Sequence, residues 1–229
     1  MDRAGDGGQG RDRGPSRRVD RQRHRRRARG RPASPRRRDP ARRAPTSDAG
    51  VGPVSRATVG KLAAYEDAGG EGFTPEGEAV VYLGAAGGER AAAIARQATS
   101  VLAVEKSPVA GLRLVERAKA QADLVPVVGD ARQPEAYGPL VPELGLLVQD
   151  VAQPDQVEIF LDNADRFQPE RGYLAVKARS IAVDRPPEQV FDRARERVAE
   201  EAAVREIVSL DPHHEDHVMI VADFDGASP

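Results

Sequence analysis

The sequence predicts an α/β fold organised around one mostly parallel sheet of seven strands. From Ala79 onward, short apolar runs alternate with segments of helical periodicity, which is the pattern of repeated β–α units. The last two apolar runs, 204–210 and 217–224, are joined by only a short loop. Such a connection permits an antiparallel hairpin but no helical crossover, so the final strand should run against its neighbours.

The expected strands are short runs of apolar residues bounded by turn or helix signals. In chain order they are 79–83, 100–105, 124–128, 144–150, 172–178, 204–210 and 217–224. Pro126 lies inside the third run. Because proline cannot donate a hydrogen bond to a sheet ladder, this strand should lie at an edge of the sheet.

The expected helices are amphipathic or alanine-rich segments between these runs. They are placed at about 89–98, 109–120, 155–166 and 188–202. The first five strands and these four helices are interpreted as a series of β–α units, which a terminal antiparallel pair follows. This arrangement fits the Rossmann-like, seven-stranded sheet of class I methyltransferases better than a six-stranded, all-parallel dinucleotide-binding sheet.

Charge divides the chain into two parts. Residues 1–46 contain 17 arginines and 5 aspartates, which gives +12, so the overall charge of −1 leaves −13 for the remainder. Residues 1–55 have almost no large apolar side chains and cannot offset the entropy of ordering. We expect a basic disordered segment over 1–55 and a folded domain over 56–229. The basic segment is interpreted as an out-of-frame or wrongly started translation, an RNA-contacting arm, or a transit peptide, although its aspartates argue against the last.

The remainder of the chain is acidic and contains no cysteine. It has only four lysines against 31 aspartates and glutamates, which suggests a halophilic source, although an acidic protein from a GC-rich genome would look similar. RNA binding to such a surface would need salt or a basic partner. No apolar run approaches the ~18 residues of a membrane span, and the N-terminus has no signal-peptide core. Membrane insertion and secretion are not expected, and the cytoplasm is the expected location.

Candidate functional residues follow the ends of the first four strands, where ligands of open parallel sheets bind. Gly84 and Gly87 allow close backbone approach after the first strand. Glu105 ends the second strand and could accept hydrogen bonds from ribose hydroxyls. Asp130 and Asp150 follow the third and fourth strands. The alternatives are a tightly packed turn, a solvated glutamate, and aspartates that cap the following helices.

Six motifs in this order resemble the fibrillarin family of box C/D ribonucleoproteins. They are YLGAAGGE, VLAVEKS, VPVVGDAR, DVAQPDQ, AVKARS and EDHVMIV, and together they extend over about 165 residues. DVAQPDQ is the most specific, because a generic nucleotide-binding fold has no reason for the whole heptapeptide. KLAA, beginning at Lys61, is similar to a further family segment. Gly87 stands where the family has serine, and the small N-terminal β-domain of archaeal members is not recognisable.

The resemblance implies an S-adenosylmethionine (SAM)-dependent methyltransferase that acts on ribose 2'-hydroxyls of pre-rRNA or tRNA. It also implies guide RNA, a box C/D scaffold protein and a kink-turn-binding protein as partners. A catalytic tetrad is implied at Lys61, Asp150, Lys177 and His217. Cofactor contacts are implied at Gly84, Ala85, Ala86, Gly87, Glu105, Lys106, Asp130, Ala131 and Asp150. No metal is expected.

Within this set, Lys177 is the expected general base, because its apolar surroundings favour the neutral amine. Asp150 would orient Lys177 while pulling it towards the charged form, and Lys61 would hold the 2'-oxygen. The DPHHEDH segment at 211–217 could also be interpreted as a metal site, although side chains in one tight turn seldom converge on an ion. Two other functions stay open, namely a catalytically silent RNA-binding subunit and an NAD-dependent oxidoreductase.

Overall fold

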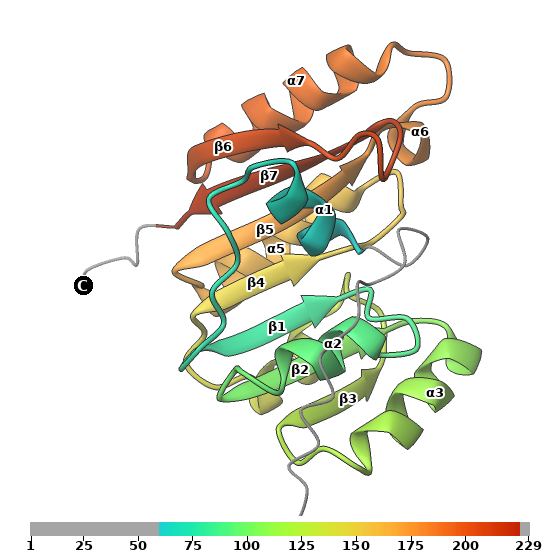
Figure 1. Ribbon diagram of the computed structural model, residues 1–229, viewed down its shortest axis with the longest axis vertical. Coiled ribbons are helices and arrows are strands. Elements are labelled where there is room, and N and C mark those ends of the chain that lie inside the picture. Colours follow the sequence, from blue (N-terminus) through green and yellow to red (C-terminus); the bar gives the residue numbers. More distant parts are fainter. Residues whose placement is uncertain (1–59, 225–229) are drawn as a thin grey trace, which may run out of the picture. The chain divides into compact units, whose positions relative to one another are not determined.

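The computed structural model describes residues 60–224, and the expectations for residues 1–55 lie outside this range. The described part is a seven-stranded sheet with helices on both faces (Figure 1). The strands are β1 (Ala79–Leu83), β2 (Ser100–Glu105), β3 (Leu124–Val128), β4 (Leu146–Gln149), β5 (Arg171–Lys177), β6 (Ala203–Ser209) and β7 (His217–Asp223). Their order across the sheet is β3-β2-β1-β4-β5-β7-β6.

The direction of the strands confirms the predicted sheet. β1 to β5 pair in parallel, whereas β7 lies between β5 and β6 and is antiparallel to both. β3 lies at an edge, as Pro126 predicts. Asp123 and Gly129 bond to β2 through their backbones. Backbone groups alternate in direction along a strand, so the nitrogen of Pro126 faces away from β2, where a missing N–H breaks no ladder.

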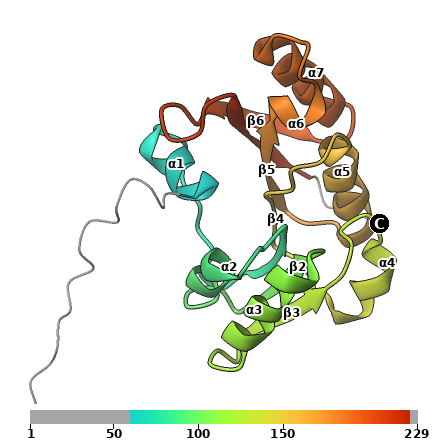
Figure 2. The ribbon, with the colours of Figure 1, turned by 90° about the vertical axis from the view of Figure 1, so that its right-hand side faces the viewer.

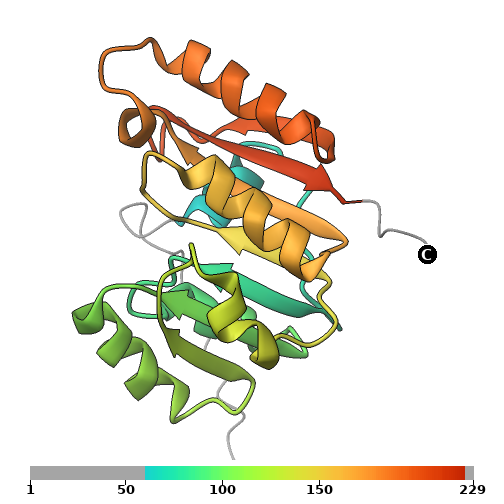
Figure 3. The ribbon, with the colours of Figure 1, turned by 180° about the vertical axis from the view of Figure 1, so that it is seen from behind.

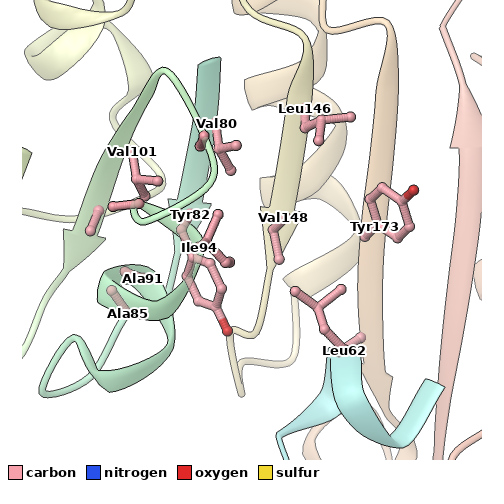
Figure 4. Close-up of a cluster of buried hydrophobic side chains, with 14 of the residues drawn as sticks. Leu62, Val80, Tyr82, Ala85, Ala91, Ile94, Val101, Leu146, Val148 and Tyr173 are labelled. Carbon is pink, nitrogen blue, oxygen red and sulfur yellow. The ribbon is translucent and has the colours of Figure 1, made fainter. Parts of the chain in front are cut away.

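Two buried clusters lie on opposite faces of the sheet, which makes three layers (Figures 2 and 3). One face is covered by α1 (Lys61–Asp67), α2 (Glu89–Ile94) and α3 (Pro108–Ala118). Tyr82, Val148 and Tyr173 lie in this cluster (Figure 4). The other face is covered by α4 (Pro134–Tyr137), α5 (Gln156–Phe167) and α7 (Pro187–Ala199). The remaining short elements are η2 (Gly138–Leu140) and α6 (Ala178–Ile181).

The helix boundaries are where structure and sequence expectation differ most. The helix expected to reach residue 98 ends at Ile94, because Arg96 and Gln97 bond three residues back and tighten the chain into turns. The short helices α1, α4 and α6 were not predicted, since seven or fewer residues show no helical period.

Candidate active site

The expected site residues meet at the carboxyl-terminal ends of the parallel strands. β7 runs the opposite way, so its first residue lies at this same end of the sheet. Lys177 ends β5 and His217 begins β7, and the two are direct partners across the antiparallel ladder. Side chains of such partners project from the same face as close neighbours. The sheet therefore brings together two residues 40 positions apart.

Asp150 is the centre of the charged cluster. Its Oδ1 lies 2.7 Å from the Lys177 Nζ and 3.6 Å from the Lys61 Nζ. The three side chains are only 13 to 20% exposed, so water screens these ion pairs less than it screens surface pairs. The Lys177 Nζ also donates to the Asp150 carbonyl at 3.3 Å. One carboxylate thus holds two amines at the strand ends.

Helix α1 delivers Lys61 to this cluster. Leu62, Ala64 and Tyr65 are its buried face. The Tyr65 hydroxyl donates to the Glu206 carboxylate on β6, and its ring packs edge-on against Tyr173 of β5. These contacts attach α1 to β5 and β6, and Lys61, the first residue of the helix, reaches Asp150 directly after β4.

The charges and burial in the cluster shift the pKa values of two side chains. Burial lowers the pKa of Lys61, with Asp150 acting in the opposite direction and Lys177 adding to the effect. Burial also lowers the pKa of His217 from 6.5, the positive charges of Lys61 and Lys177 lower it further, and the Glu215 carbonyl and Asp150 oppose the shift. Both groups therefore lose a proton more easily than in water.

The glycine-rich turn after β1 lies directly beside Asp150. Gly84 has φ +79°, and a Cβ there would come within 2.6 Å of the Asp150 carbonyl oxygen. The backbone N–H groups of Gly84 and Ala85 both donate to the Val104 carbonyl. The Ala86 N–H donates to the Glu105 carboxylate at 2.8 Å. These hydrogen bonds attach the turn to β2. Residue 84 must be glycine, because a side chain there would collide with the Asp150 carbonyl.

Glu105, Lys106 and Asp130 lie at the ends of β2 and β3, at the same end of the sheet as Asp150. Glu105 accepts one backbone N–H on each oxygen, from Ala86 and from Ser107 at 2.7 Å, so its carboxylate is held in one orientation. The Lys106 Nζ lies 2.7 Å from Asp130 Oδ2, and this hydrogen bond lowers the pKa of Asp130. Ala131 follows with its side chain buried in the core. The expected cofactor residues therefore lie along adjacent strand ends.

Two residues of the quoted motifs play a part that sequence reasoning missed. Gln156, the last residue of DVAQPDQ, is fully buried, and its side-chain amide bonds to the backbone of Lys177. Arg132, the last residue of GDAR, forms a two-pronged ion pair with Asp155, at 2.6 and 2.7 Å. For Gln156 the sequence does contain a signal, which is a glutamine at the start of an apolar helix face. For Arg132 it contains none, because the partner of Arg132 is 23 residues away.

The structure also tests the alternative interpretation of Asp155 as a helix cap. Asp155 precedes α5 but forms no side-chain cap bond, since its carboxylate is paired with Arg132. In the histidine-rich turn at 211–217, the His213 Nε2 lies 3.4 Å from Asp67, and the His214 ring packs 5.7 Å from that of His217. Within residues 60–224, no group of three or more metal-binding side chains is arranged to hold an ion. No helix of this range has the length and apolar character needed to cross a membrane.

Comparison with known proteins identifies the family. A family model described as Fibrillarin matches residues 58–226. The chain belongs to the fibrillarin family. A relative from Methanopyrus kandleri, named fibrillarin-like rRNA/tRNA 2'-O-methyltransferase, is 38% identical over 173 residues, which are 72% of this chain and 75% of that relative. The match to a relative of the same name from Thermococcus onnurineus, 39% identical, spans 63% of this chain and 66% of that protein.

Solved structures of fibrillarins have the same fold. Aeropyrum pernix fibrillarin with natively bound S-adenosyl-L-methionine is 33% identical, with a TM-score of 0.65 over 73% of this chain and 76% of that one. The fibrillarin of a fibrillarin/Nop5p complex is 33% identical, with a TM-score of 0.67 over 72% and 81%. The family resemblance and the seven-stranded sheet expected from the sequence are both confirmed.

Proposed function

We propose that this fibrillarin-family chain transfers a methyl group from SAM to the 2'-hydroxyl of ribose in RNA. The observation that carries the proposal is the convergence of Lys61, Asp150 and Lys177, with His217 beside them, directly next to the turn at Gly84. These residues come from four separate segments. A purely structural ion pair would not need two amines and an imidazole around one carboxylate at the ligand-binding edge of the sheet.

The residues along the adjacent strand ends fit SAM. Gly84 leaves open the space that a Cβ would fill beside Asp150. Glu105 is held by two backbone N–H groups, so its remaining lone pairs are available to ribose hydroxyls. Asp130, two residues after β3, would be a charged acceptor for the adenine edge. SAM would supply a methyl group on a positively charged sulfur, and the Aeropyrum pernix relative binds it natively.

The charged cluster would act on the target ribose. Lys61 and Lys177 are donors that can hold the 2'-oxygen and stabilise negative charge as it develops there. Asp150 keeps both amines in place. Holding the oxygen in line with the methyl carbon contributes to the rate by itself, up to about 7 to 11 kcal/mol in favourable systems.

The partners belong to the same proposal. Guide RNA would select target nucleotides in rRNA or tRNA by base pairing, while a box C/D scaffold protein and a kink-turn-binding protein complete the particle. The Nop5p complex of a relative supports the scaffold. Residues 47–229 carry a net charge of −13, so high salt or a basic partner would have to reduce repulsion between this domain and RNA phosphates.

The decisive experiment is methyl transfer to a guide-matched RNA within a particle assembled from the full chain, guide RNA and both partner proteins. Label from SAM should enter the matched nucleotide, and a target with 2'-deoxyribose at that position should receive none. Asp150→Asn should reduce the rate by about 100-fold or more, while Asp162→Asn, an exposed position on α5, should not change it. Transfer to the 2'-deoxy target, or calorimetric binding of NAD but not SAM, would reject the proposal.

A further inference from the structure

Beside Asp150 lie the two amines of Lys61 and Lys177 and the imidazole of His217, which differs from them in its chemistry. The Lys61 and Lys177 amines are both ion-paired to Asp150 Oδ1. An ammonium group has three donors and no acceptor, so in these ion pairs neither amine can receive a proton. The imidazole of His217 is a nitrogen base beside them, as the direct ladder partner of Lys177.

The local chain decides which ring nitrogen of His217 is available. Its Nδ1 lies 2.6 Å from the carbonyl oxygen of Glu215, two residues earlier. A carbonyl oxygen can only accept, so Nδ1 must carry the hydrogen. In the neutral ring Nε2 then has a lone pair and no hydrogen.

We propose that Nε2 of His217 accepts the proton of the ribose 2'-hydroxyl during methyl transfer. The inference rests on the proposed function and differs from the expectation that Lys177 is the base. The 2'-oxygen bonds to the methyl carbon while the carbon–sulfur bond breaks and its electron pair remains on sulfur, which becomes a neutral thioether. The hydroxyl proton moves to Nε2, and the resulting imidazolium releases it to water.

The surroundings keep His217 ready to accept. Facing it are Lys177 on β5, Lys61 on α1 and Asp150 after β4, with His214 against its ring. In its own turn, Asp216 is occupied by Arg179 at 2.8 Å. Burial and the two lysines outweigh Asp150, so the pKa of His217 lies below 6.5 and the ring is neutral at neutral pH.

The first test reads the ring directly, without activity. Long-range ¹H–¹⁵N spectra of histidine-labelled protein, recorded well above pH 6.5, should show Nδ1 of His217 protonated and Nε2 bare. The His217→Gln variant identifies the signals. A ring protonated on Nε2 would overturn the inference, whatever the activity of the particle.

The second test uses single-turnover methyl transfer across a pH series. His217→Gln should bind SAM within about threefold of the wild type, transfer methyl about 100-fold or more slowly, and lose the acid limb of the pH profile. In His217→Ala, added imidazole should restore part of the rate. His213→Gln, which changes the histidine paired with Asp67, serves as the matched control and should keep both rate and profile.

The outcomes separate the two claims. A His217→Gln variant that keeps the wild-type rate, or that slows but keeps the acid limb, overturns the assignment of His217 while the methyltransferase function stands. A wild-type particle that binds SAM and transfers nothing contradicts the proposed function, and the ring spectra still decide whether His217 presents a bare Nε2.

Discussion

Gln156 and Lys177 are joined side chain to backbone: the Gln156 Oε1 accepts the Lys177 N–H at 2.9 Å, and its Nε2 donates to the Lys177 carbonyl at 3.4 Å. The same Nε2 donates to the Gln153 carbonyl at 2.8 Å. One fully buried amide thus connects the start of α5 to the end of β5, where the Lys177 side chain leaves the sheet.

Gln156→Leu tests this connection. Leucine keeps the volume but leaves the part-buried Lys177 N–H without its side-chain partner, so the free energy of unfolding should fall by about 1 to 3 kcal/mol in urea titrations. Methyl transfer should fall as well, because Lys177 loses its backbone support. Gln189→Leu, at an exposed position on α7, should change neither quantity, and an unaltered stability of Gln156→Leu would contradict the role.

Gly84→Ala should be poorly tolerated. Its Cβ would lie 2.6 Å from the Asp150 carbonyl in a backbone conformation with φ +79°. The strain should cost about 1 to 3 kcal/mol of stability, and the displaced carbonyl should weaken SAM binding measured by calorimetry.

Gly87→Ala is the matched control within the same turn. Its φ is not positive, and its Cβ would first meet the flexible Glu89 carboxylate at 3.0 Å. This variant should keep the stability of the wild type. Equal losses in the two variants would mean that position 84 has no special requirement for glycine.

Arg132→Lys should impair catalysis more than folding. Lysine cannot reproduce the two-pronged contact with Asp155, which holds the 150–155 loop against the end of β3. The single-turnover rate should drop about tenfold, which corresponds to roughly 1.4 kcal/mol. Arg171→Lys, which weakens the ion pair with Asp223 at the opposite end of β5 from Lys177, should leave the rate unchanged.

Lys177→Arg should retain SAM affinity and lose methyl transfer. The guanidinium keeps the positive charge but is too large and planar for a position 2.7 Å from Asp150 and 13% exposed. Calorimetry with SAM and the guide-RNA methylation assay measure the two properties separately. Normal turnover in this variant would show that the amine is not needed at that position.

Stability should depend on pH through His217. Its folded pKa lies below 6.5, so the unfolded chain binds the proton more readily. The stability contributed by the neutral ring is therefore complete above pH 6.5 and is lost as the pH falls through the lowered folded value. Urea unfolding at successive pH values should show this loss in the wild type and not in His217→Gln. Asp130 and Asp155, whose pKa values are lowered from 3.8, act in a separate, more acid range.

Much of the architecture could be predicted from local patterns. Apolar runs placed all seven strands to within a few residues, and Pro126 predicted the edge position of β3. Short helices escaped prediction, because α1, with seven residues, is stabilised by Tyr65 packing on β5 and β6 rather than by its own periodicity. Family motifs pointed to the site residues, but not to the contacts of Gln156 or Arg132, whose partners lie 21 and 23 residues away.

By itself, the sequence determined the strand pattern, the terminal antiparallel pair and the types of residue at the strand ends, because these depend on periodicity and on neighbours along the chain. Only the tertiary structure decided that Lys61 and Lys177 share one Asp150 oxygen, and that His217 lies directly beside Lys177 across the ladder of β5 and β7. Distances of this kind arise when distant segments pack together, and no local rule contains them.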